Sequence, residues 1–210
     1  MLRKLTMIVA VAFGVFAPQA AMSQQSLSAD LARDFIDRLG QRTMAALKSE
    51  GAQQRGTELG RILLDGLDFD TIAMHTLGRY GRRPDSSEFR EFATLFAAHV
   101  IDMAVEKFGN MPVESYAVTS TQPMPNGDVV VNTSVAAAGT INAGWRVRLM
   151  AGAPKIVDIV VDGYSMTTHF NGQFQDWLSK AGLEGLVGKM RSQVRNSPSL
   201  VVVREIRGNG

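Results

Sequence analysis

The N-terminal half of the chain shows a helical pattern of apolar positions. Between Leu27 and Phe108, apolar residues recur every three or four positions with charged residues between them. This spacing collects the apolar side chains on one face of a helix. Glycines at 51 and at 78–81 interrupt the pattern, so the region is predicted as several helices. The last begins after Asp85-Ser86-Ser87-Glu88, which offers N-cap residues with a capping-box spacing, and it is rich in phenylalanine.

After Pro112 the period changes from helix to strand. Runs rich in Val, Thr and Ile follow one another, and Asn126-Gly127 between two of them is a strong hairpin signal. In the run 144–151 the apolar residues alternate with Arg146 and Arg148. Such alternation gives a strand one buried and one wet face. An antiparallel sheet of about four strands is therefore predicted.

Beyond Asp162-Gly163 the helical period returns. Met166, Phe170 and Phe174 recur at helical spacing, and a break is predicted near Gly182 before a final helix. The run Leu200 to Val203 has strand propensity but no place in the predicted sheet. Helices, then a meander, then helices predict an α+β domain, a curved sheet covered on one face by N- and C-terminal helices. The predicted boundaries are a domain over 24–195, with helices in 27–109, sheet in 112–162 and helices in 164–195, followed by a tail over 196–210.

The first residues have the layout of a secretory signal. Arg3 and Lys4 precede an apolar run from Leu5 to Ala17, and Ala21-Met22-Ser23 is a small-residue cleavage site. The apolar run is short for a transmembrane helix, although an anchor that stays attached is the alternative. We therefore expect residues 1–23 to be a signal peptide and the mature protein to be exported to the periplasm.

Charge and cysteine content exclude several classes of function. The chain has 22 basic and 20 acidic residues, and two of the basic ones lie in the predicted signal peptide. A balanced mature chain argues against a nucleic-acid partner, which would need a basic excess. The sequence has no cysteine, so it forms no disulfide and uses no thiol or cysteine-ligated metal. The three histidines lack the spacing of metal ligands, so no metal site is predicted.

The segment 158–174 combines Asp158, Ser165 and His169 beside a glycine turn. A nucleophilic serine at such a turn favours Gly-x-Ser-x-Gly, but here Thr167 occupies the place of the second glycine. A serine in the first turn of a helix is more often a cap. The sequence therefore favours capping by Ser165 or Asp162, and leaves a Ser165/His169 hydrolase as the alternative.

Apolar and aromatic residues are unusually abundant in the segments that flank the predicted sheet. Phenylalanines of the two long helical segments, two tryptophans and several methionines are all expected to point toward one region between helices and sheet. Methionine is adaptable and suits a surface that accepts a flexible ligand. A half-open sheet under such helices can enclose an apolar pocket. The simpler interpretation, that each of these residues belongs to an ordinary core, stays open.

The order and spacing of two segments resemble the MlaC family. They run from Phe69 to Asp102 and from Lys155 to Met190, and their most specific motifs are Leu77-Gly78-Arg79-Tyr80 and the strand–Asp-Gly-Tyr-Ser–helix unit. The resemblance implies an NTF2-like sheet-and-helix architecture with an apolar cavity, and a non-enzymatic, monomeric carrier of one lipid. No cofactor is implied other than the bound phospholipid.

The resemblance also implies partners and a role. Family members carry a phospholipid between an inner-membrane complex of MCE-domain protein and ABC transporter and an outer-membrane lipoprotein–porin complex. That transport maintains outer-membrane lipid asymmetry and solvent tolerance. A related branch implies a hopanoid or another polycyclic lipid as the alternative ligand. A protein-only adaptor with a filled core is a further alternative.

Under this hypothesis, apolar residues of the helices and the sheet line or gate the lipid pocket, and two polar residues lie at its mouth for the headgroup. The lining residues are predicted as Phe92, Phe96, Met103, Trp145, Val147, Ile159, Val161, Tyr164, Met166 and Phe170, and the mouth residues as Arg79 and Tyr80.

Overall fold

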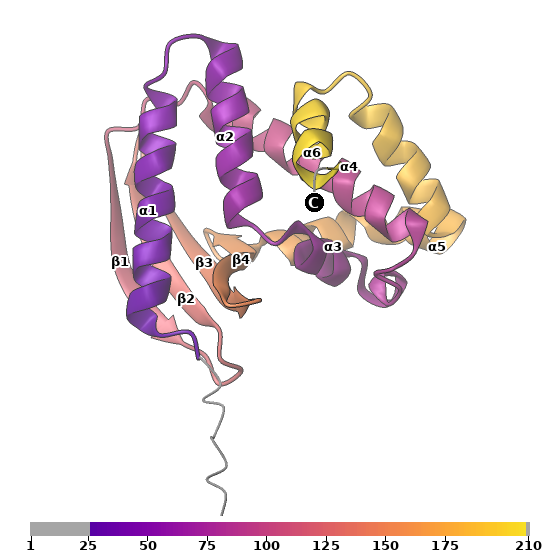
Figure 1. The fold of residues 1–210 in the computed structure, drawn as a ribbon, viewed down its shortest axis with the longest axis horizontal. Helices are drawn as coiled ribbons and strands as arrows, with labels where there is room; N and C mark the ends of the chain where they lie inside the picture. The colour runs from indigo at the N-terminus through magenta and orange to yellow at the C-terminus, as the bar shows by residue number, and fades with distance from the viewer. Residues whose placement is uncertain (1–25, 209–210) are drawn as a thin grey trace, which may run out of the picture.

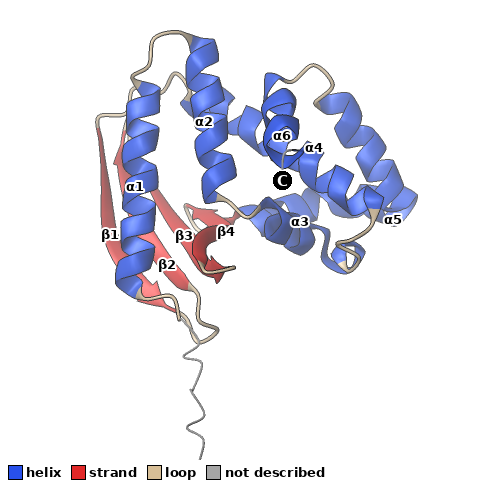
Figure 2. Cartoon of the chain, in the orientation of Figure 1, coloured by secondary structure: helices blue, strands red, loops and turns tan. Residues whose placement is uncertain are grey.

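The computed structural model describes residues 26–208, so the predicted signal peptide lies outside the described residues. One long helix lies over the sheet, and a larger group of helices packs together beside it (Figures 1 and 2). The helices are α1 (Ala29–Leu47), α2 (Ala52–Gly66), α3 (Phe69–Leu77), the 3-10 helix η1 (Gly78–Gly81), α4 (Ser87–Phe108), α5 (Met166–Gln193) and α6 (Pro198–Gly208). The strands are β1 (Ser115–Pro123), β2 (Val129–Ala136), β3 (Thr140–Met150), β4 (Ala153–Val161) and β5 (Tyr164–Ser165).

The strands form one antiparallel meander in the order β1-β2-β3-β4-β5. The predicted hairpin between β1 and β2 is present, with Gly127 at φ 85°. Asp162 and Gly163, at φ 50° and 85°, make the turn between β4 and β5. Positive φ is easy for glycine and tolerated by aspartate, which explains this dipeptide. The prediction of an antiparallel α+β fold is confirmed, with a fifth strand of two residues added.

Capping side chains fix where the helices begin. Ser28, Asp68, Ser86 and Ser165 each accept a hydrogen bond from a backbone N–H three residues later. Such a bond satisfies one of the N–H groups that the first turn leaves free. For α4 the cap is Ser86, which confirms one of the predicted N-cap candidates, but the capping box predicted from Asp85 to Glu88 is wrong because Asp85 is not the cap.

The helices cover one face of the sheet and pack on one another beside it. Helix α1 lies over β1 and β2 (Figure 1), where the Tyr116 hydroxyl donates to the Ile36 carbonyl at 3.1 Å. Burial raises the pKa of Tyr116 to about 12, so this donor keeps its proton. Helix α4 contacts α2, α3, α5 and α6 and is the centre of the helical part. No helix among residues 26–208 has the length and hydropathy to span a membrane.

The C-terminal segment is helical. Leu200 to Val203, whose residues favour strands, lie in α6, which packs against α4 and α2. Leu200 and Val203 are one turn apart and both buried, and Arg207 forms an ion pair with Asp70 of α3. Burial of that one-turn stripe outweighs the strand propensity of the valines. The tail therefore packs against the predicted domain.

Candidate functional site

Four phenylalanines pack together between α4 and α5. The centroids of Phe96 and Phe170 are 5.0 Å apart, and those of Phe92 and Phe96 5.4 Å. Phe174 completes the group, with its ring 5.9 Å from Phe92. All four side chains are buried, at 0–6% exposure. We call Phe92, Phe96, Phe170 and Phe174 the aromatic cluster; its edge-to-face and stacked pairs are the geometry of a tightly packed core.

His99 lies at the edge of the aromatic cluster, with its ring 5.9 Å from that of Phe170. Burial lowers the pKa of His99, against a smaller opposing effect of Asp102. The imidazole is therefore mainly neutral at pH 7, as an edge beside phenylalanine rings requires. The sequence predicted the helix that carries His99, but not that the His99 ring lies beside Phe170.

A second group of apolar side chains lies at the end of the sheet and is only partly covered. In the strand register, Trp145 lies opposite Ile159, and Val161 lies opposite Tyr164, so the four share one sheet face. Met166 follows directly at the start of α5. Trp145, Ile159, Val161 and Met166 are half-buried and Tyr164 is 78% exposed. We call Trp145, Ile159, Val161, Tyr164 and Met166 the apolar wall.

The N-terminal half of α1 supplies more apolar surface on the same side of the sheet. Leu31 is 40% exposed and Phe35 is half-buried, and α1 contacts β4 as well as β1 and β2. Both residues fall within the helical pattern of the N-terminal half of the sequence, which does not show how far each side chain is buried. What distinguishes Leu31 and Phe35 is their incomplete burial on an element that contacts the sheet.

The structure separates the predicted lining residues into three groups. Phe92, Phe96 and Phe170 belong to the aromatic cluster, and Val147 is fully buried opposite Val129 and Ile156. Trp145, Ile159, Val161 and Met166 form the half-buried part of the apolar wall. Met103 and Tyr164 are 43% and 78% exposed, so neither side chain is packed into the interior.

Coverage by neighbouring elements explains why Met103 and Tyr164 are exposed. The buried stripe of α4 ends at Ile101, so Met103 continues the period one turn beyond the cover. Tyr164 sits in a two-residue strand just after a tight turn, at the sheet edge. Period predicts which face a side chain lies on, but only tertiary packing determines whether that face is covered.

Asp158 joins the apolar wall to α5. Its carboxylate accepts from the Ser165 hydroxyl at 2.6 Å and from the backbone N–H of Thr167 at 3.1 Å. The Ser165 oxygen accepts from the Thr168 N–H, which confirms the predicted cap. His169 is exposed and its Nε2 lies 2.9 Å from the Gln173 side-chain nitrogen. Ser165 is thus engaged by Asp158 and the helix, while His169 is engaged elsewhere.

The predicted mouth residues lie in η1. Arg79 donates to the Tyr80 hydroxyl at 3.0 Å, and its guanidinium carbon lies 5.0 Å from the centre of the Tyr80 ring. Helix η1 packs against α3 and α5, and the Asn171 side chain of α5 donates to the Thr76 carbonyl nearby. The pair is therefore held against the N-terminal half of α5.

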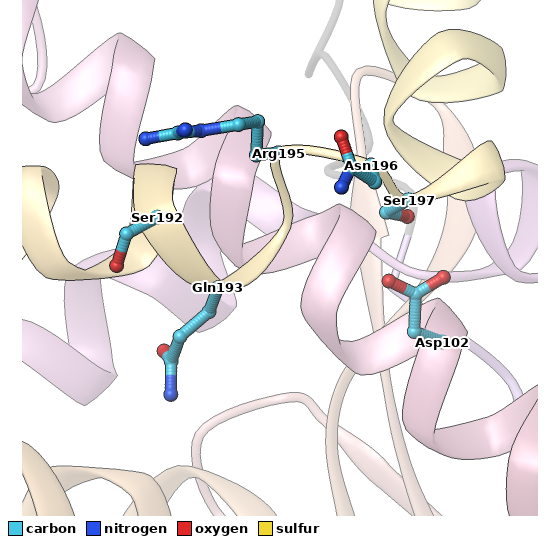
Figure 3. Close-up of a pocket in the computed structure, with 6 residues that line it drawn as sticks. All are labelled: Asp102, Ser192, Gln193, Arg195, Asn196 and Ser197. Carbon is cyan, nitrogen blue, oxygen red and sulfur yellow. The ribbon is translucent and has the colours of Figure 1, made fainter.

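Two hollows of about 550 Å³ and 380 Å³ lie where α5 meets α6. Asp102, Ser192, Gln193, Arg195, Asn196 and Ser197 line the larger one (Figure 3). Arg191, Arg204 and Leu200 are among the residues around the smaller one. None of the predicted lipid-lining residues borders either hollow. Within residues 26–208, no three His, Asp or Glu side chains come together as a metal site requires.

The fold and the site together define a class of protein: an α+β protein in which the helices cover part of an apolar sheet face only incompletely. The model of the MlaC protein family matches residues 34–192. The chain therefore belongs to the MlaC family.

The fold also has a counterpart among solved structures. A phospholipid-binding protein from Ralstonia solanacearum, in complex with a phospholipid, is similar with a TM-score of 0.68 at 19% identity. The similarity covers 77% of this chain and 96% of that one. At this identity the likeness concerns the fold. No curated protein matches the sequence of this chain.

Proposed function

We propose that the protein is a periplasmic carrier that binds a phospholipid by its acyl chains. The apolar wall carries this proposal, because it is an apolar sheet face left partly open in a member of the MlaC family. The Ralstonia protein of similar fold, which holds a phospholipid, supports it. The carrier exchanges its lipid with an inner-membrane complex of MCE-domain protein and ABC transporter and with an outer-membrane lipoprotein–porin complex, and so maintains outer-membrane asymmetry.

The physical need for a carrier is large. Two acyl chains contain roughly 30 methylenes, and exposing them to water costs on the order of 25 kcal/mol at about 0.8 kcal/mol each. An apolar surface that replaces water around the chains removes most of that cost without any chemistry. Such a protein needs no catalytic residue, cofactor or metal.

The contacts favour a particular placement of the chains. The aromatic cluster is fully packed, so lipid there would require α4 and α5 to separate. The apolar wall needs no such separation, because Trp145, Ile159, Val161 and Met166 are already partly exposed. We therefore place the acyl chains on the wall, facing α1, with the aromatic cluster as the rigid body behind them. Arg79 and Tyr80 stay our candidates for the headgroup.

Native mass spectrometry of protein purified from its own cells tests the proposal. The expected result is one co-purifying phospholipid per chain, and the lipid mass distinguishes it from a hopanoid or another polycyclic lipid. A lipid-free protein that also takes up no labelled phospholipid from vesicles would contradict the carrier and favour a protein-only adaptor.

The hydrolase alternative is tested by Ser165→Ala. For a carrier the variant keeps lipid transfer and loses about 1 kcal/mol of stability, because a helix cap and the bond to Asp158 are removed. Thr168→Ala, at an exposed position of the same helical turn, is the matched control. Lipid hydrolysis that occurs in the parent and Thr168→Ala proteins but not in Ser165→Ala would establish an enzyme instead.

A further inference from the structure

The sheet carries a charged group on the face opposite to the apolar wall. Arg146 and Arg148 alternate with Trp145 and Val147 along β3 and therefore project from the other side. Both converge on Asp128, which precedes β2. Arg148 donates to the Asp128 carboxylate from Nε at 2.8 Å and from Nη2 at 3.0 Å, and Arg146 donates from Nε.

The carboxylate at the centre of this group is almost inaccessible. The Asp128 side chain is 1% exposed, whereas those of Arg146 and Arg148 are 32% and 31% exposed. Asn126 also donates to Asp128, at 2.9 Å. Burial alone would raise the pKa of Asp128, but the hydrogen bonds from Arg148, Asn126 and Arg146 outweigh it and lower the pKa to about 2. The carboxylate is therefore a permanent, buried anchor for two arginines that reach solvent.

This arrangement leaves hydrogen-bond donors over. The Asp128 carboxylate bonds both guanidinium groups and Asp68 also lies near Arg148, while among residues 26–208 Arg146 Nη1 and Nη2 and Arg148 Nη1 have no hydrogen-bond partner. Asp158 lies opposite Arg146 in the register, but its oxygens are occupied by Ser165 and by the backbone N–H groups of Ile159 and Thr167. Two planar donor groups held in fixed orientation suit a tetrahedral or planar oxyanion.

We propose that Arg146 and Arg148, oriented by buried Asp128, form a binding site for a phosphate oxyanion on the sheet face opposite to the apolar wall. The phosphate is supplied either by lipid headgroups at a membrane surface or by free phosphate. A site on this face is separate from the proposed acyl-chain site, so it holds whether or not the wall binds lipid. Because Asp128 fixes both side chains in advance, little side-chain entropy is lost when the anion binds.

The first arm of the test is NMR of the arginine Nε–H groups of the full chain titrated with inorganic phosphate. We expect saturable shifts of the Arg146 and Arg148 signals. In Arg146→Gln and Arg148→Gln phosphate affinity should fall at least about tenfold. Arg42→Gln, which removes the same charge from a surface pair with Asp65, should change it less than about twofold.

The second arm uses co-sedimentation with phosphatidylglycerol vesicles. Loss of vesicle binding in Arg146→Gln and Arg148→Gln, but not in Arg42→Gln, identifies membrane headgroups as the source. Saturable phosphate binding without vesicle binding identifies free phosphate. Absence of both phosphate and vesicle binding in the parent protein overturns the proposal, even if an acidic peptide binds instead. Phosphate binding that is unchanged in Arg146→Gln and Arg148→Gln, when circular dichroism shows these variants to be folded, overturns it as well.

Asp128→Asn separates a built site from a simple patch of positive charge. A patch would bind phosphate more tightly when a negative charge is removed, whereas a site oriented by Asp128 should bind it more weakly. Tighter binding by folded Asp128→Asn would therefore also overturn the proposal. Arg148→Lys, which keeps the charge but loses the planar fork, should weaken phosphate binding several-fold in the oriented site.

Discussion

The aromatic cluster and the apolar wall are built from the same kinds of side chain but differ in how far neighbouring elements bury those side chains. The cluster lies between α4 and α5, and its four side chains are 0–6% exposed. The wall lies at the end of the meander, and its members are half-buried or, at Tyr164, 78% exposed. Apolar composition alone therefore does not separate core from binding surface. Incomplete burial by neighbouring elements distinguishes a binding surface from a core, because it leaves apolar area that a ligand can still remove from water.

The two regions are also joined differently to the rest of the fold. Ring-to-ring contacts hold the aromatic cluster, and each ring touches at least one other. The wall ends at a two-residue strand, and Asp158 and Ser165 connect it to α5. Incomplete burial and a short edge strand are features of regions that open at low cost. The cluster thus gives stability, while the wall is free to change with a ligand.

The largest effect is expected from Phe96→Ala. This removes a fully buried ring that contacts three others, and the free energy of unfolding should fall by about 3–5 kcal/mol. Chemical denaturation measures it. The fraction that stays folded should bind lipid as the parent does. A variant of unchanged stability that no longer binds lipid would reverse the roles assigned to the two regions.

Ile159→Ser tests whether the apolar wall contacts lipid. The side chain is half-buried, so stability should fall by only about 1 kcal/mol, whereas uptake of labelled phospholipid should fall about tenfold as a polar group enters the apolar surface. Val160→Ser, one residue along β4 and on the opposite face, is the matched control. Equal loss of uptake in both variants would show that β4 is sensitive to serine rather than that the wall contacts lipid.

A smaller, pH-dependent effect is expected from His99. Burial lowers its pKa in the folded protein, so the unfolded chain binds a proton more readily. The stability that depends on neutral His99 is complete above the unfolded pKa of about 6.5 and decreases as the pH falls below it. His99→Gln should flatten this decrease in denaturation measured from pH 7.5 to 5.

His75 provides the comparison for that experiment. Partial desolvation and the nearby Arg148 and Arg146 also lower its pKa, but the His75 side chain on α3 is exposed, whereas His99 is half-buried beside Phe170. His75→Gln should therefore change the pH dependence less than His99→Gln does. The reverse order would mean that the aromatic cluster is not the pH-sensitive region.

The sequence predicted local structure better than it predicted which residues are buried by other helices and strands. Helical period, the Asn126-Gly127 turn and the serine caps identified the main elements and the inward face of Phe170 and Phe174, because each depends on neighbours in sequence. It could not distinguish the fully buried Phe96 from the half-buried Ile159. That distinction depends on which elements, far apart in the chain, pack over each residue.

Two further features lay beyond sequence reasoning for the same reason. Leu200 to Val203 have strand propensity, and only the surfaces of α4 and α2 make them helical. Asp128, Arg146 and Arg148 come together through the register of β2 and β3, which the alternation of arginines with apolar residues did not reveal. In both cases tertiary contacts decide the outcome.

The smallest effect on stability is expected at the edge of the wall. Tyr164→Ala removes a side chain that is 78% exposed, so the free energy of unfolding should change by less than about 0.5 kcal/mol. If Tyr164 borders the acyl chains, the variant should release labelled phospholipid about two- to fivefold faster, since part of the apolar cover is lost. Val201→Ala, 68% exposed on α6, is the control and should leave the release rate unchanged. An unchanged rate of phospholipid release from Tyr164→Ala would show that Tyr164 does not contact the acyl chains. The binding surface would then consist of the half-buried residues of the apolar wall alone, with Val161 at its edge.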